Sequence, residues 1–197
     1  MRKEVPEQVV VGIDAGGRAD HAVRAALDMH VRFGTRVALI HAVGIPLPDD
    51  VGGDPMFSAS VNAEILTKTY KAISERLAPL YEEAGLSGEE ARSHLQVFPG
   101  KAARTIVQHA RDVSADLIMI GPHQRRALLD FGRTARAVIA EARCDLWVQP
   151  EEFTPIRKIL VPIDLSEDSW TALEAARDFA LRMDASITVM HCFVPPE

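Results

Sequence analysis

The sequence predicts an open parallel α/β sheet with helices on both faces, followed by the beginning of a second copy of the same unit. Short apolar runs, which suit strands buried on both faces, alternate with segments of helical periodicity. Residues 8–46 also align without a gap on residues 158–196, at an offset of 150. The identical pairs include Asp14 with Asp164 and His41 with His191, so duplication explains the match better than chance periodicity.

The first 150 residues are expected to hold five strands separated by helices. Asp14 and two glycines close the first apolar run, and Gly34 stands where a left-handed residue ends a helix. Residues 85–92 are polar and no element is assigned to them, and Pro79 is expected to kink or divide a long helix. The expected strands are 9–13, 37–43, 95–98, 116–120 and 145–149, and the expected helices are 20–33, 60–84, 101–113 and 134–142.

A proline-bounded acidic segment, PEEFTP, marks a domain boundary. We therefore expect one domain at 1–150, a linker at 151–155 and a partial second repeat at 156–197. The second repeat should form a strand, a helix and a strand at 159–163, 169–183 and 187–193. These are only two strands and one helix of a five-stranded design. Their apolar faces must then be covered by the first domain, by another chain or by further sequence.

Composition and charge narrow the class of protein. The chain is 47% hydrophobic and 25% charged, as expected of a soluble globular protein. A net charge of −6 argues against nucleic-acid or membrane partners, since both need a basic face. The N-terminus lacks a signal-peptide pattern, and no run approaches the ~20 apolar residues of a membrane span. We expect a cytoplasmic protein in which Cys144 and Cys192 are buried free thiols.

The carboxyl edge of the predicted sheet is where a ligand site is expected. In open parallel sheets, ligands bind beyond the strand ends, near helix N-termini. Asp14, the loop that starts at Gly44, and the segment 121–133 all fall on that edge. The spacing GIDAGGRAD differs from the dinucleotide fingerprint GxGxxG, and Gly100-Lys101 lacks the earlier glycine of a Walker loop.

The segment GPHQRRALLDFGRTAR follows the fourth predicted strand. Gly121 lies at the strand tip and Gly132 lies before a helix whose first amides are free, so the segment could hold a phosphate or another small anion through main-chain amides and arginines. The alternative is a solvated loop with ordinary surface arginines. The residues alone leave both interpretations open. The arginines concerned are Arg125, Arg126, Arg133 and Arg136.

Three stretches together resemble the universal stress protein family over residues 8–150: VVVGIDAGG, GKAARTIVQHARDVSADLIMIGPH and GRTARAVIAEARCDLWVQ. The run KILVPIDLSEDSWTALEAARDFA resembles the start of a second such domain, as in a tandem-type member with a truncated second repeat. The resemblance implies a Rossmann-like sheet related to the adenine nucleotide alpha hydrolases. It also implies a stress-response regulatory role, and many family members bind ATP or AMP.

The resemblance also places a binding site. Asp14 matches an aspartate that contacts the nucleotide, and Val43 matches a residue near adenine. Gly121 and Gly132 match the first and last glycines of a phosphate loop of pattern GxxGx9G(S/T). The candidate nucleotide-binding residues are Asp14, Val43, Gly121, His123, Gln124, Gly132, Arg133 and Thr134.

The phosphate loop departs from the family pattern at three points. Gln124 replaces the second glycine, Arg133 stands where Ser or Thr is expected, and the loop is two residues shorter. Losing a close backbone approach and a hydroxyl donor should weaken phosphate binding. The Gly-x-His-Gln sequence also resembles the family branch that binds no nucleotide. The alternative function is therefore an interaction module that acts by dimerising or docking.

Several residues have structural interpretations that compete with ligand binding. Asp14 is also a residue type that caps a turn, and its recurrence as Asp164 suits either role. His41 and His191 are interpreted as core-edge histidines with a hydrogen-bond partner rather than metal ligands. No catalytic arrangement can be placed from spacing, so no enzyme activity is expected. The resemblance implies pairing through the fifth strand, here residues 145–149, and we expect a homodimer.

Overall fold

Two compact units make up the chain, one containing Pro6–Phe153 and the other containing Thr154–Glu197. The expected linker, 151–155, spans the point at which one unit gives way to the next. The computed structural model describes residues 5–45, 55–121, 132–149 and 152–193, without the side chains of 55–61.

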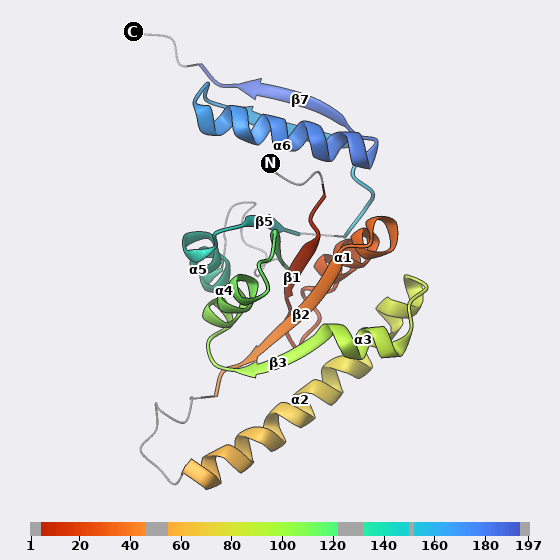
Figure 1. The fold of residues 1–197 in the computed structure, drawn as a ribbon, viewed down its shortest axis with the longest axis vertical. Coiled ribbons are helices and arrows are strands. Elements are labelled where there is room, and N and C mark those ends of the chain that lie inside the picture. The colour runs from red at the N-terminus through yellow and green to blue at the C-terminus, as the bar shows by residue number, and fades with distance from the viewer. Residues whose placement is uncertain (1–4, 46–54, 122–131, 150–151, 194–197) are drawn as a thin grey trace. The chain divides into compact units, whose positions relative to one another are not determined.

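The first unit is built on a five-stranded sheet in which all neighbouring strands are parallel. The strand order is β3-β2-β1-β4-β5, so the chain winds outward from β1 in one direction and then returns to continue from β4 in the other (Figure 1). The predicted doubly wound sheet is therefore confirmed. The strands are β1 (Gln8–Gly12), β2 (Arg36–Val43), β3 (Leu95–Pro99), β4 (Leu117–Ile120) and β5 (Asp145–Val148).

Helices cover both faces of this sheet. In Figure 1, α4 and α5 lie together on one side of the strands, and α1, α2 and α3 lie on the other. The three inner strands β1, β2 and β4 are largely buried, as expected for a parallel sheet covered on both faces. The helices are α1 (Asp20–Phe33), α2 (Pro55–Glu83), α3 (Gly88–His94), α4 (Ala102–Asp112) and α5 (Arg133–Glu141).

Two helices differ from the sequence prediction. No helix was expected in the polar residues 85–92, but α3 begins inside them because Ser87 and Glu90 form a capping box. Ser87 Oγ accepts the Glu90 amide at 3.2 Å, and the Glu90 carboxylate accepts the Ser87 amide at 2.7 Å. Pro79 lies inside α2 without dividing it, since Leu77 and Leu80 beside it are buried.

The second unit contains β6 (Lys158–Ile163), α6 (Glu167–Met183) and β7 (Ser186–His191). Strands β6 and β7 are parallel, and their pairs from Lys158–Ser186 to Pro162–Met190 lie 150 positions after the pairs of β1 and β2. The two βαβ segments therefore share one strand register. Both cysteines are free, but the expected burial holds for neither: Cys144 is half-buried, and Cys192 is exposed just after β7.

Within the ranges that the structure describes, no helix is both long enough and apolar enough to cross a membrane.

A cluster of aromatic side chains joins the ends of α1, α2 and α3. Tyr81 is fully buried, and its hydroxyl lies 2.9 Å from Nδ1 of His94. The His94 ring meets the His30 ring edge-on, with 5.2 Å between their centroids. Burial, and then the neighbouring His30, lower the pKa of His94 below its ordinary value. The cluster is therefore built around an uncharged His94 ring.

This cluster predicts that the free energy of unfolding falls in mild acid. In the unfolded chain His94 gains a proton near its ordinary pKa of about 6.5, whereas the folded protein resists protonation until lower pH. The unfolded state then binds more protons, so stability is complete above pH ~6.5 and declines as the pH drops below it. Urea unfolding between pH 8 and 5 measures this slope. His94→Gln should flatten it, and an unchanged slope would contradict the prediction.

Candidate functional site

Asp14 organises the turn between β1 and α1. Its Oδ1 accepts the amide of Gly16 at 2.7 Å, and its Oδ2 accepts the amide of Ala19 at 3.1 Å. The guanidinium of Arg18 adds an ion pair, with Nε 3.6 Å from Oδ1. Aspartate at a strand end commonly accepts main-chain amides in this way. The turn-capping role that the sequence suggested for Asp14 is therefore present in the structure.

Arg76 of α2 holds the same turn from the helical layer. Its guanidinium forms an ion pair with Asp20 at the start of α1, and its Nη2 donates to the main-chain oxygen of Asp14 at 3.0 Å. Sequence reasoning missed this residue. The available signal was its position between the buried Ile73 and Leu77, since a charged residue on a core-facing stripe needs a partner.

Gly121, directly after β4, lies against the turn that Asp14 organises. A Cβ atom at Gly121 would stand 2.7 Å from Cα of Ala19 and 2.9 Å from the main-chain oxygen of Arg18. Both neighbours are backbone atoms, so no flexible side chain could move aside. Glycine is therefore required for the end of β4 to meet the β1–α1 turn. Strands β1 and β4 are neighbours in the sheet, so their ends lie side by side.

Val43 ends β2, the strand on the other side of β1. Its main-chain oxygen accepts the amides of Ile45 at 2.7 Å and Gly100 at 2.8 Å. This second bond connects the ends of β2 and β3. The structure therefore places Asp14, Val43 and Gly121 after or at the ends of three adjacent strands, at one edge of the sheet.

The N-terminus of α5 is the remaining described part of the candidate site. Gly132 is buried and precedes the helix, whereas Arg133 and Thr134 are exposed in its first turn. Among the described residues, no side chain caps this helix N-terminus, so its first amides suit an anion. Other predicted residues of the loop lie outside the described residues: His123, Gln124, Arg125 and Arg126.

The hydrogen-bond partner expected for each histidine is present in both repeats, but His41 is half-buried whereas His191 is exposed. Nδ1 of His41 lies 2.9 Å from the main-chain oxygen of Ile13, and Nδ1 of His191 lies 2.8 Å from that of Ile163. A carbonyl oxygen only accepts, so each Nδ1 carries the proton. Within the described parts of the chain, no group of three acidic, His or Cys residues is arranged to hold a metal ion.

Asp164 repeats the turn of Asp14 in the second unit. Its Oδ1 accepts the amide of Ser166 at 3.0 Å and the hydroxyl of the same serine at 2.5 Å. These hydrogen bonds lower the pKa of Asp164 to about 2 and keep its carboxylate charged at neutral pH. The aspartate thus shapes the strand–helix turn in both repeats.

The doubly wound parallel sheet, with a glycine-bounded segment between β4 and α5, defines a class of α/β domains with sites at the carboxyl edge. The sequence profile of the universal stress protein family matches residues 6–150 and 155–197. The match covers nearly the whole chain, which therefore belongs to the universal stress protein family. The resemblance seen in the sequence is confirmed.

Solved structures show the same fold. A universal stress protein from Archaeoglobus fulgidus is 14% identical, with a TM-score of 0.62, and the match covers 93% of this chain and 65% of that chain. One from Pseudomonas aeruginosa is 22% identical, with a TM-score of 0.51, over 76% of this chain and 49% of that chain. This chain thus spans about half of the Pseudomonas protein.

A universal stress protein, UspA, from Lactobacillus plantarum is 18% identical, with a TM-score of 0.51, over 72% of this chain and 97% of that chain. None of the curated proteins gives a significant sequence match. At these identities the likeness establishes the fold.

The close contact at Gly121 predicts that Gly121→Ala destabilises the first unit. The added methyl group would overlap the backbone of Ala19 and Arg18, and forced overpacking costs about 1–3 kcal/mol. Gly44→Ala is the matched control, because Gly44 directly follows β2 at the same edge and a Cβ there would meet nothing within 4 Å. Urea denaturation measures both, and equal stability of the two variants would contradict the contact.

Proposed function

We propose that this protein is a cytoplasmic stress-response regulator that binds an adenine nucleotide, ATP or AMP, at the carboxyl edge of its first sheet. Family membership and the predicted site support the proposal. The observation that carries it is the convergence of the Asp14 turn, the Gly121 strand end and the uncapped N-terminus of α5 at that edge. The protein acts by binding, without catalysing a reaction.

Each part of the edge suits a different part of the nucleotide. Val43 offers an apolar surface for adenine, and Asp14 offers a carboxylate for ribose hydroxyl groups. The first-turn amides of α5 and the guanidinium of Arg133 suit phosphate oxygens, since both are hydrogen-bond donors that favour negative charge. His123 and Gln124 complete the proposed site in the segment between β4 and α5.

Asp14→Ala should weaken ATP and AMP binding about tenfold or more, because a carboxylate bond to the ligand is lost. The substitution also removes two turn hydrogen bonds, a loss of about 1 kcal/mol in stability. Asp164→Ala is the matched control, since it removes the equivalent turn bonds in the second unit. Isothermal titration calorimetry measures the affinities of both variants.

Two outcomes would count against this proposal. Equal loss of affinity in Asp14→Ala and Asp164→Ala would mean that Asp14 acts only through its turn. If the unaltered protein shows no detectable binding at millimolar nucleotide, the proposed nucleotide binding is wrong.

The second candidate is an interaction module that binds no nucleotide. The observation that favours it is that both Asp14 oxygens already accept amides of their own turn. Asp164 forms a similar turn in a unit without the glycine segment, so the turn itself needs no ligand. The departures at Gln124 and Arg133 point the same way. A nucleotide titration that detects no binding would favour this candidate.

In either case we propose a homodimer that pairs through β5. This strand ends the sheet order and pairs with β4 on one side. The amides of Asp145 and Gln149 donate to main-chain oxygens beside β4, at 3.2 and 2.9 Å. Amides alternate along a strand, so those of Leu146 and Val148 point to the open edge. An open edge of this kind can accept a strand of a second chain.

Val148→Pro should therefore convert the dimer to a monomer, because proline removes an outward amide without breaking the bonds to β4. Light scattering should show the mass falling to 21.6 kDa. Val148→Ala keeps the amide and should remain dimeric. A monomeric unaltered protein, or a Val148→Pro variant that folds and stays dimeric, would refute the β5 contact.

A further inference from the structure

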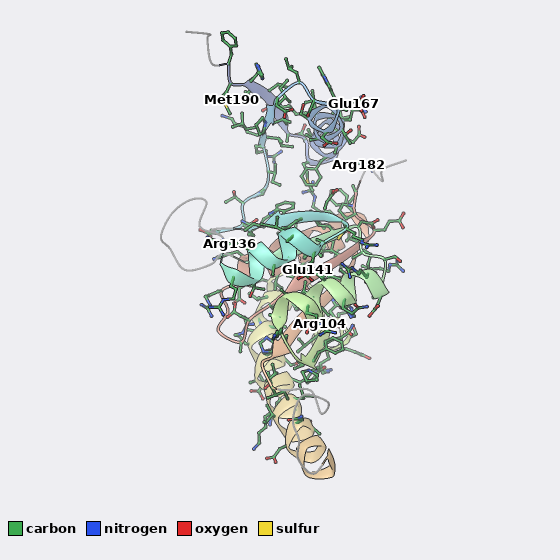
Figure 2. The ribbon with its side chains drawn as sticks, turned by 90° about the vertical axis from the view of Figure 1, so that its left-hand side faces the viewer. Arg104, Arg136, Glu141, Glu167, Arg182 and Met190 are labelled. Atoms are coloured by element: carbon green, nitrogen blue, oxygen red, sulfur yellow. The ribbon has the colours of Figure 1, made fainter. Side chains whose placement is uncertain are left out.

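The outer surface of α4 and α5 is basic, although the chain as a whole has a net charge of −6. Residues 101–113 and 132–143 contain six basic residues and two acidic ones, and all eight are exposed. In Figure 2 these two neighbouring helices face the viewer, with Arg104 labelled on α4 and Arg136 on α5. Arg133 belongs to the candidate nucleotide site. The other five basic residues form what we call the basic face: Lys101, Arg104, Arg111, Arg136 and Arg143.

Helical periodicity places the basic face on the side of α4 and α5 that lies away from the sheet. The buried residues of both helices are apolar and belong to the core cluster under the sheet. Arg104 and Arg111 are seven residues apart, so they share the outer side of α4 at about 10.5 Å along its axis. Arg136 and Arg143 have the same spacing in sequence, and Ile139 between them is 48% exposed. The basic face therefore has two rows of arginines, one with an exposed apolar side chain.

The fold provides no carboxylate partner for most of these charges. Lys101, Arg104, Arg111 and Arg143 form no ion pair with any carboxylate in the described ranges. Arg111 donates from Nη2 to the main-chain oxygen of Glu141 at 2.9 Å, which leaves its charge unneutralised. The positive charge of the basic face is therefore available to a ligand.

The other helices follow the charge pattern that favours folding. Helices α1, α3 and α6 each have an acidic residue in the first turn, where a carboxylate stabilises the positive end of a helix. Neither α4 nor α5 has one. On the opposite helical layer, Arg24 of α1 also pairs with Glu83 of α2 at 3.0 Å. The stability of the fold therefore does not account for the charges on α4 and α5.

Three features favour a short acidic polypeptide over a nucleic acid or an anionic membrane. The net charge of −6 repels an extended polyanion, whereas a short segment meets only the basic face. Asp112 and Glu141 end the two helices at the same edge of the sheet, because both helices run antiparallel to the strands, so they limit the length of anion that fits. Ile139 offers an apolar contact that suits a side chain better than a phosphate backbone.

We propose that the basic face binds a short acidic segment of a partner protein. Its carboxylates lie opposite the arginines of α4 and α5, since guanidinium groups bind carboxylates through paired hydrogen bonds. One apolar side chain of the segment packs on the exposed Ile139. This binding needs no nucleotide, so it is independent of the function proposed for the carboxyl edge.

A fluorescein-labelled polyglutamate peptide with one central leucine is the probe, and fluorescence anisotropy with the full-length protein measures its affinity. Added salt should weaken binding, because the charges are exposed. Arg104→Glu should weaken it about tenfold or more, since an attraction becomes a repulsion. Arg92→Glu is the matched control, because Arg92 is an exposed arginine of α3 and the net charge changes equally. It should leave the affinity nearly unchanged.

The apolar contact is tested with a peptide that carries serine in place of leucine. The unaltered protein should prefer the leucine peptide, and Ile139→Ser should remove that preference. The proposal is overturned if the leucine peptide does not bind, if its preference survives Ile139→Ser, or if Arg104→Glu and Arg92→Glu weaken its binding equally. It is also overturned if oligothymidylate or phosphatidylserine vesicles bind more tightly than the peptide through Arg104, since the partner would then be a nucleic acid or a membrane.

Discussion

The closed turn between β1 and α1 is the constraint on which the candidate site depends. Asp14 gathers the amides of Gly16 and Ala19, and Arg76 attaches the turn to the helical layer through α2. The end of β4 then approaches so closely that only glycine fits at position 121. The two central strands therefore end against one rigid turn. Any ligand at this edge meets a surface that the polypeptide has already organised.

The hydrogen bonds of this turn also give Asp14 a structural role that is independent of any ligand. An aspartate that served only a ligand would have free oxygens in the protein alone, whereas Asp14 has an amide partner for each. Asp164 has a similar arrangement where the glycine segment is absent. The aspartate is therefore explained by folding in both repeats. A nucleotide role for Asp14 must be an addition to its structural role, and the N-terminus of α5 becomes the more informative part of the site.

The two repeats share one sequence pattern, but equivalent strand positions are buried in the first unit and exposed in the second. Val10 and Ile40 are buried by α4, whereas their counterparts Leu160 and Met190 are exposed. A fully buried side chain of this size contributes roughly 1.5–3 kcal/mol relative to an exposed one. In the described second unit, Leu160 and Met190 therefore lack the stabilisation that Val10 and Ile40 obtain from α4. Its strands, helix and register form nonetheless, because α6 still covers one face of the pair.

Most of the fold followed from local pattern. Buried strands and amphipathic helices have distinct periods, and the offset of 150 predicted a shared register for β1–β2 and β6–β7. There are two exceptions. The helix α3 lies in a polar stretch, and the Ser87–Glu90 capping box defines its start. Pro79 broke no helix, because the buried residues on either side hold α2 together by tertiary packing.

The sequence by itself determined the fold class, every element except α3, the family and the strand ends that form the candidate edge. These follow from periodicity and motif, which are properties of neighbouring residues. Only the tertiary structure decided that Arg76 reaches the Asp14 turn and that Gly121 is packed against it. Only it showed which face of β6 and β7 stays open. Those facts depend on contacts between segments far apart in the chain, and no local pattern specifies such distances.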